Sequence, residues 1–175
     1  MTYISIESKI QAAIKAKKLF ELESLLTGDE TARTMIVSAD IIAAVTPPFP
    51  DTEDGLRRAE FRGWLDGFLE GGEISVAEDP DKKPRNTMLA RVHPTDAEFW
   101  SIRVTDPNDT AGIRSLGAFA GYDEFVALDW EYREHMSDFD MDVQSAMDHW
   151  RDIFGDCAPH DGDSLDEYLS NSRPL

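Results

Sequence analysis

The chain has 175 residues, of which 41% are hydrophobic and 10% aromatic, and its formal net charge is −18. This composition indicates one folded domain rather than a disordered chain, and no apolar run reaches the roughly 18 residues that a membrane span needs. The net charge argues against direct nucleic-acid binding, which needs Lys and Arg to neutralise phosphates. Cys157 is the only cysteine, which excludes an internal disulfide and a cysteine-rich zinc site.

The negative charge is concentrated toward the C-terminus. From residue 123 onward there are 15 acidic and 3 basic residues, whereas the first 122 residues hold 20 and 14. Such a surface repels anionic membranes as well as nucleic acid. The first ten residues, MTYISIESKI, lack the basic start and apolar stretch of a secretory signal, so we expect a cytoplasmic protein.

The first 46 residues are predicted to form a helical cap on the domain. Apolar residues at helical spacing favour a helix over 5–27, either continuous or split in two. A second helix is expected from Ala39 to Val45, with Ser38 as its N-cap. Three prolines within residues 47–50 then interrupt the chain, since proline cannot continue a helix.

Residues 54–136 are predicted to form a helix followed by an antiparallel sheet. The helix spans 54–70, and its apolar stripe consists of Phe61, Trp64, Leu65, Phe68 and Leu69. Alternating residues separated by short turns then favour a meander of about four strands. The segments with this pattern are 73–77, TMLARV, 98–104, IRSLGAFA and DEFVALDW. In 98–104, one face is expected to carry Trp100, Ile102 and Val104, and the other Phe99, Ser101 and Arg103.

Residues 137–175 are predicted to be an acidic, helical C-terminal region. Asp140 is expected to cap a helix that ends at Gly155, and Ser164 with Glu167 makes a capping box for a last short helix. The predicted fold class is therefore α+β in a single domain, with N-terminal helices, a central antiparallel meander and C-terminal helices.

The sequence gives little support for a metal or a cofactor. Asp138, Asp140 and Asp142 are spaced as at the start of a calcium loop, but Val143 and His149 stand where that loop needs glycine and glutamate. His160 with Asp161 and Asp163 leaves a cation site open. There is no phosphate-binding glycine loop and no G-x-S-x-G nucleophile motif. We therefore expect no cofactor and no metal.

Residues 98–136 resemble the strand core of the RelE/HigB-like toxin superfamily. The resemblance lies in FWSIRV and in GIRSLGAFAGYDEFVALDWEYREHM, which match its x-I-R strands and phenylalanine-rich antiparallel sheet. Those toxins cut ribosome-bound mRNA with Arg, Lys or Tyr near the scissile phosphate, which implies roles for Arg103, Arg114, Arg133 and Tyr132. This chain departs from the family in its charge, because the toxins are basic and their basic tail is replaced here by acids.

A longer stretch, from SVAEDPDKKPRNTMLARV to WRDIF, is similar to an uncharacterised family of bacterial and prophage proteins. This second resemblance implies a phage or mobile-element setting and no particular activity.

The charge distribution favours a non-catalytic protein that presents an acidic face to a basic protein partner, for example as an inhibitor of a nucleic-acid-binding protein. Complementary charge speeds association and selects partners. The alternative is a RelE/HigB-like endoribonuclease or another hydrolase. The acidic face is predicted to consist of Asp138, Asp140, Asp142, Asp148, Asp152, Asp156, Asp161, Asp163, Asp166 and Glu167.

Overall fold

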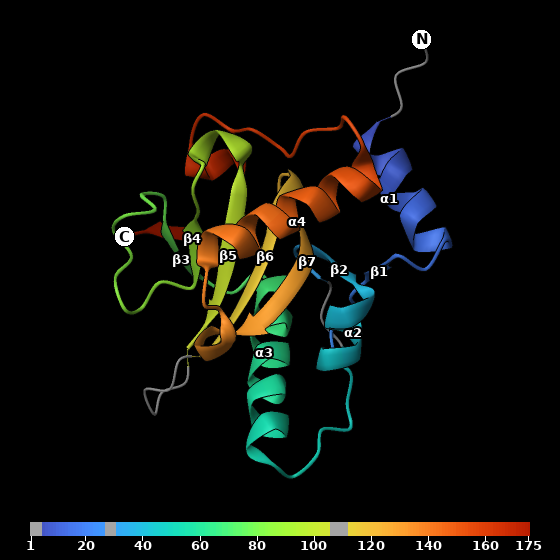
Figure 1. Ribbon diagram of the computed structural model, residues 1–175, viewed down its shortest axis with the longest axis vertical. Coiled ribbons are helices and arrows are strands. Elements are labelled where there is room, and N and C mark those ends of the chain that lie inside the picture. Colours follow the sequence, from blue (N-terminus) through green and yellow to red (C-terminus); the bar gives the residue numbers. More distant parts are fainter. Residues whose placement is uncertain (1–4, 27–30, 106–111) are drawn as a thin grey trace.

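A computed structural model of the chain describes residues 5–26, 31–105 and 112–175. Its centre is one eight-stranded sheet in the order β1-β2-β7-β6-β5-β4-β3-β8, and helices cover both faces (Figure 1). The strands are β1 Leu19–Glu21, β2 Thr34–Ser38, β3 Ile74–Ala77, β4 Leu89–Arg91, β5 Phe99–Val104, β6 Ile113–Gly121, β7 Glu124–Tyr132 and β8 Ser172–Pro174.

The sheet is mixed. The strands β4, β5, β6 and β7 pair antiparallel in chain order, and β1 pairs antiparallel with β2. Three pairs are parallel, namely β2 with β7, β3 with β4, and β3 with β8. Strands from the beginning and the end of the chain therefore extend the two sides of the central meander.

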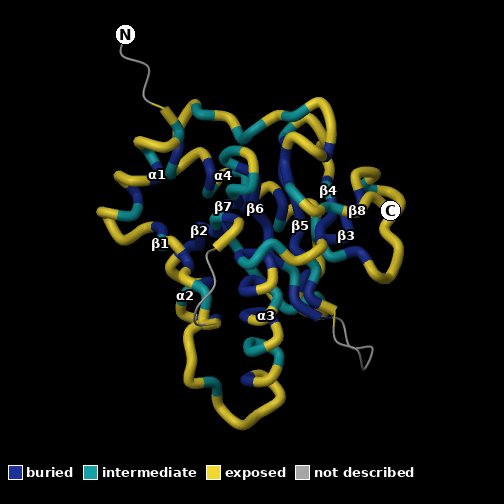
Figure 2. The backbone as a smooth tube through the Cα atoms, turned by 180° about the vertical axis from the view of Figure 1, so that it is seen from behind, coloured by how far each residue is buried: buried dark blue, intermediate teal, exposed yellow. Residues whose placement is uncertain are grey.

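The helices form two layers, one on each face of the sheet. The α-helices are α1 Ile6–Lys15, α2 Ala39–Val45, α3 Glu53–Leu69 and α4 Phe139–Phe154, and the short 3-10 helices are η1 Thr95–Ala97, η2 Arg133–His135 and η3 Leu165–Glu167. Figure 1 shows α4 crossing the front of the sheet toward α1, while the upper end of α3 passes behind the strands and α2 lies to the right of α3. The buried segments in Figure 2 lie mainly in the strands and on the sides of the helices that face them.

Each face of the sheet has its own hydrophobic core. On the α2 and α3 face, Phe61 and Phe68 pack in one cluster with Trp100 and Phe119. On the α1 and α4 face, Trp150 and Phe154 pack with residues that include Phe99. The predicted alternation of β5 is confirmed, since Trp100, Ile102 and Val104 lie in the first core and Phe99 in the second.

The predicted fold class is wrong. The molecule is an α/β fold with a single eight-stranded mixed sheet, not a four-strand meander between N-terminal and C-terminal helices. The helix expected over 5–27 ends at Lys15, because Lys17 has a left-handed backbone conformation with φ of 57°, and the chain then enters β1. The N-terminal and C-terminal regions both contribute strands to the sheet as well as helices.

The helix boundaries near 39–45 and 54–70 are confirmed to within one residue, and the Ser38 hydroxyl accepts a hydrogen bond from the Ile41 amide, as expected. The expected cap of α4 is wrong by two residues. The Asp138 carboxylate, not that of Asp140, accepts a hydrogen bond from the Met141 amide at 3.2 Å. Ser164 forms no capping hydrogen bond, and η3 is a single 3-10 turn.

Within the described residues, no helix is both long and apolar enough to cross a membrane.

Candidate functional site

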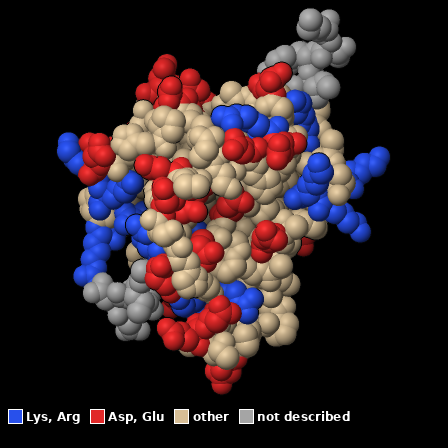
Figure 3. Space-filling view, viewed as in Figure 1, with Lys and Arg blue, Asp and Glu red and all other residues tan. Residues whose placement is uncertain are grey.

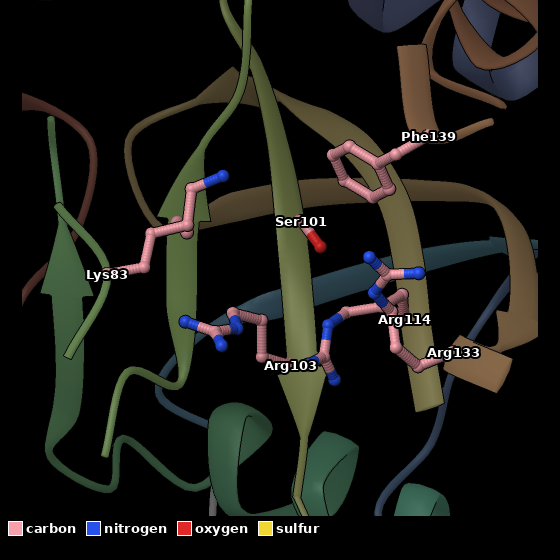
Figure 4. Close-up of a pocket in the computed structure, with 7 residues that line it drawn as sticks. Lys83, Ser101, Arg103, Arg114, Arg133 and Phe139 are labelled. Carbon is pink, nitrogen blue, oxygen red and sulfur yellow. The ribbon is translucent and has the colours of Figure 1, made fainter. Parts of the chain in front are cut away.

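A cavity lined by basic side chains lies on the sheet face that carries α4. Its volume is about 210 Å³, and Figure 4 shows its side chains on one side of the sheet, with the Ser101 hydroxyl directed among them. We call it the basic cavity. It is lined by Lys83, Ala90, Ser101, Arg103, Arg114, Arg133 and Phe139.

The strand register brings two of the arginines together. Successive residues of a strand point to opposite faces, so Arg103 shares the face of Ser101, away from the core that contains Ile102. In the antiparallel pair of β5 and β6, Arg103 is the direct partner of Arg114. Two arginines that are separate in sequence therefore extend from neighbouring positions on one face.

The other basic residues come from the segments around these strands. Arg133 is the first residue of η2, directly after β7, and Lys83 belongs to the loop between β3 and β4. Phe139, the first residue of α4, lies near both of these cations. Its ring centroid is 5.7 Å from the Lys83 ammonium nitrogen and 5.9 Å from the Arg133 guanidinium carbon.

Small side chains create the hollow. Ala90 of β4 is the register partner of Ser101 of β5, and both residues are buried. Neither side chain is large enough to fill the space between the surrounding arginines. The small side chains of Ala90 and Ser101 therefore form the bottom of the cavity, and the long basic side chains form its walls.

The cavity concentrates positive charge. Burial, and then the like charges of Arg103 and Arg133, lowers the pKa of Arg114 to about 10. Burial and the neighbouring Arg133 lower the pKa of Arg103, while desolvation and the charge of Arg103 lower that of Lys83. Arg114 still carries its charge at neutral pH, because its pKa remains well above 7.

Two of the three guanidinium groups donate hydrogen bonds to backbone carbonyls close to them in the sequence. An Nη1 of Arg114 donates to the Ile113 carbonyl at 3.0 Å, and that of Arg133 donates to the Met136 carbonyl at 3.0 Å. Among the residues that the structure describes, the buried Nη1 of Arg103 has no hydrogen-bond partner. An unpaired buried donor is costly, because folding removes its water without replacing it.

These three arginines differ from seven others in the described residues, which are paired with carboxylates. Arg57 contacts Glu134 at 2.6 Å, Arg62 contacts Asp66 at 3.1 Å, and similar pairs involve Arg33, Arg58, Arg91, Arg151 and Arg173. Over residues 5–26, 31–105 and 112–175, no carboxylate lies within 4.0 Å of the guanidinium groups that line the basic cavity.

An acidic recess of about 180 Å³ adjoins the basic cavity, and Arg114 lines both. Its carboxylates are Asp129, Glu131 and Asp142. Glu131 is the register partner of Arg114, but its Oε1 accepts hydrogen bonds from the Tyr132 amide at 2.8 Å and pairs with His135 at 3.2 Å. Burial, and then the charges of Asp138 and Glu131, raises the pKa of Asp142.

The structure brings together only part of the set that the toxin resemblance implies. Arg103, Arg114 and Arg133 line the same cavity. Tyr132 is directed to the opposite face, where it packs against the α3 core and its hydroxyl donates to Asp54. The alternation of β7 accounts for this separation, because Tyr132 follows Glu131, which shares a face with Arg114.

The ten residues of the predicted acidic face lie along α4 and the segment that follows it, up to η3. Nine of them are exposed and Asp142 is half-buried. Asp148 contacts Arg151 at 2.5 Å, and among the described residues the other nine form no ion pair with Lys or Arg within 4.0 Å. Figure 3 shows the acidic side chains of this view spread over the surface, with other residues between them.

The possible cation site around His160 is organised by other contacts. The His160 Nε2 lies 2.9 Å from the Glu167 carbonyl oxygen, and the Asp163 amide donates to the Glu167 carboxylate at 2.9 Å. In the described part of the chain, no group of three or more His, Cys, Asp or Glu residues is positioned to hold a metal ion.

Lys83, Ser101 and Phe139 were not expected at a site. The strand pattern predicts that Ser101 and Arg103 share one face of the sheet. Two polar residues two positions apart, next to an arginine on the neighbouring strand, are therefore the signal that could have indicated Ser101. Lys83 and Phe139 carry no such signal, because they reach the cavity through the β3–β4 loop and the start of α4.

Comparison of the chain with protein-family models, with curated proteins and with solved structures gave no match.

Proposed function

We propose that this protein binds a small anionic ligand in the basic cavity. The observation that carries the proposal is that three arginines and a lysine line one hollow, while no carboxylate is among the described residues that line it. Guanidinium groups present paired N–H donors that match carboxylate and phosphate oxygens. A bound anion would neutralise repulsion among these cations and give the Arg103 guanidinium an acceptor.

The size of the cavity favours a single anionic group. Sites for drug-sized ligands usually measure about 300–1,000 Å³, whereas the basic cavity measures about 210 Å³. The cavity thus has room for a charged group and a small part of the ligand that carries it.

The lining also favours binding over catalysis. General acid–base chemistry needs a group that exchanges protons near neutral pH, such as histidine or a carboxylate. The described lining residues are four cations, one serine, one alanine and one phenylalanine. Among the described residues, the Ser101 hydroxyl donates to the Ile102 carbonyl at 3.4 Å and forms no hydrogen bond with a lysine, histidine or carboxylate that could activate it.

The test is anion binding by isothermal titration calorimetry and by thermal unfolding, with sulfate and acetate as probes. We expect binding that Arg103→Met and Arg114→Met each weaken about tenfold or more, because each removes a charge and keeps a long side chain. Arg151→Met is the matched control, since Arg151 is an exposed arginine of α4 that pairs with Asp148. Binding that is absent in the native chain, or that the control weakens equally, would contradict the proposal.

The endoribonuclease alternative relies on the same three arginines, and their common cavity is the observation in its favour. Two features weigh against it, namely the position of Tyr132 on the opposite face and the net charge of −18. Incubation of the purified protein with mRNA in a translating extract distinguishes the two functions. We expect no cleavage beyond that of the Arg114→Ala variant, and cleavage that depends on Arg114 would replace the binding proposal.

A basic protein partner is a second candidate, favoured by the exposure of nine acidic residues along α4 and the segment after it. The partner would contact these carboxylates, most of which lack an ion pair within the described residues. Reversal of Asp140, Asp148 and Asp152 to lysine should then abolish capture of a purified basic partner. Reversal of Glu7, Glu21 and Glu60, which are exposed elsewhere on the fold, is the control for net charge.

A further inference from the structure

The geometry points to a phosphate monoester, bound as its dianion, as the group that the basic cavity takes. This inference rests on the proposed function and narrows it to one class of ligand. It depends on the number of charges in the cavity, on the directions from which donors reach it, and on the acidic residues around it.

The charge of the cavity favours a dianion over a monoanion. Lys83, Arg103, Arg114 and Arg133 supply four positive charges, and no lining residue in the described part of the chain supplies a negative one. A carboxylate or a phosphodiester brings one negative charge, whereas a phosphate monoester brings about 1.5 to 2 at pH 7. The dianion therefore removes more of the repulsion between the cations and interacts with more of them at once.

The arrangement of the donors favours a tetrahedral group. The cations come from four different elements, namely the β3–β4 loop, β5, β6 and η2, and Figure 4 shows them around the hollow. Ser101 adds a hydroxyl at the floor. A carboxylate offers two oxygens in one plane, whereas a phosphate monoester offers three terminal oxygens that point in different directions. Three acceptors suit donors that approach from several sides.

The surroundings of the cavity disfavour a nucleic-acid strand. Asp138 and Asp140 are exposed on either side of Phe139, and Asp81 is exposed two residues before Lys83. A strand that placed one phosphodiester in the cavity would bring its neighbouring phosphates close to these carboxylates, in a protein with a net charge of −18. A terminal monoester brings no neighbouring phosphates.

The test compares four probes by isothermal titration calorimetry, namely methyl phosphate, dimethyl phosphate, acetate and sulfate. At pH 7.5 we expect methyl phosphate and sulfate to bind at least tenfold more tightly than dimethyl phosphate and acetate. Arg103→Met should remove this preference, and Arg151→Met should retain it.

A pH series separates charge from shape. The second pKa of a phosphate monoester is about 6, so lowering the pH from 7.5 to 5 leaves roughly a tenth of methyl phosphate as the dianion and should weaken its binding about tenfold. Sulfate stays a dianion, and its affinity should change less than threefold. The sulfate series also accounts for titration of the protein groups nearby. In the cavity these are Lys83, Arg103, Arg114 and Arg133, and around it they are Asp81, Asp129, Glu131, His135, Asp138, Asp140 and Asp142.

Each outcome distinguishes the two proposals. If acetate or dimethyl phosphate binds as tightly as methyl phosphate, and Arg103→Met weakens both, the protein is an anion-binding protein but the inference of a dianionic monoester is overturned. A methyl phosphate affinity that does not change between pH 7.5 and pH 5 also overturns it. If none of the four probes binds, the proposed function itself fails.

Discussion

Arg103 of β5 and Arg114 of β6 are direct partners across an antiparallel strand pair, on a sheet face where neither has a carboxylate within 4.0 Å among the described residues. Like charges at directly opposed positions destabilise a sheet by a few tenths to about 1 kcal/mol. The ligand-free molecule thus tolerates a local cost at the place where it has a cavity. A bound anion removes that cost.

We expect that removing one charge of the Arg103–Arg114 pair stabilises the ligand-free protein. Arg114→Met should raise the free energy of unfolding by roughly 0.5 kcal/mol, because one of two opposed charges disappears. In a chain of this size that corresponds to about 1–2 °C in Tm. Thermal unfolding at low salt measures it, with Arg151→Met as the control. A decrease in Tm for Arg114→Met would show that the repulsion is already compensated.

Removal of the Tyr168 hydroxyl should lower the stability of the protein substantially. Its hydroxyl donates to the Glu98 carboxylate at 2.6 Å and accepts from the Gly162 amide at 2.8 Å, and its side chain is buried. Tyr168→Phe removes both hydrogen bonds and leaves Glu98 with only its ion pair to Arg91, so we expect a loss of about 1–3 kcal/mol in the free energy of unfolding. Urea denaturation measures it. Tyr122→Phe is the control, because Tyr122 is exposed and should change stability by less than about 0.5 kcal/mol.

We expect the hydrogen bond between His149 and Asp129 to make a pH-dependent contribution to stability. Its hydrogen bond to Asp129, at 3.0 Å, raises its pKa above the ordinary value near 6.5 in spite of its partial burial. A histidine whose pKa is raised by folding stabilises the fold below its unfolded pKa, and this contribution is lost as the pH rises through the folded pKa.

We therefore expect His149→Gln to lower the free energy of unfolding by about 0.2–1 kcal/mol more at pH 6 than at pH 8.5, as for other partly exposed pairs. Urea denaturation at the two pH values measures this. In an Asp129→Asn background the difference between the two pH values should disappear. If it persists there, another group is responsible.

The N-cap of α4 gives a test that separates two neighbouring aspartates. Asp138→Ala removes the side chain that accepts from the Met141 amide, and we expect a cost of about 1 kcal/mol. Asp140→Ala removes only a first-turn charge, worth about 0.3–1 kcal/mol at low salt. Urea denaturation in high salt should reduce the second effect more than the first. Equal effects in high salt would contradict the cap at Asp138.

The local features of the fold were more predictable than its topology. Periodicity located α3 and α4, and alternation placed Trp100 and Ser101 on opposite faces of β5. The sheet was underestimated because β2, with the sequence TMIVS, is short and almost fully buried. Such a strand shows no alternation of apolar and polar residues.

The candidate site was only partly predictable for a related reason. The strand pattern placed Arg103 on one face, but its pairing with Arg114 depends on the register of β5 and β6, which the sequence does not specify by itself. The concentration of acids in the last third of the chain also gave no indication of a basic cavity, because net charge describes the whole molecule and not the charge at one site. The structure shows that three arginines without an ion pair to any described carboxylate can gather in a strongly acidic chain.

The parallel pairing of β2 with β7 bears on how the chain folds. Met35 is the register partner of Phe125, and about half of the chain lies between them. Contacts between such distant segments form slowly, because a long loop must close before they gain any stability. Residues 1–46 in isolation would leave β2 without its neighbour, so we expect that peptide to stay unfolded and the N-terminal segments to dock late, after the hairpin of β6 and β7 exists.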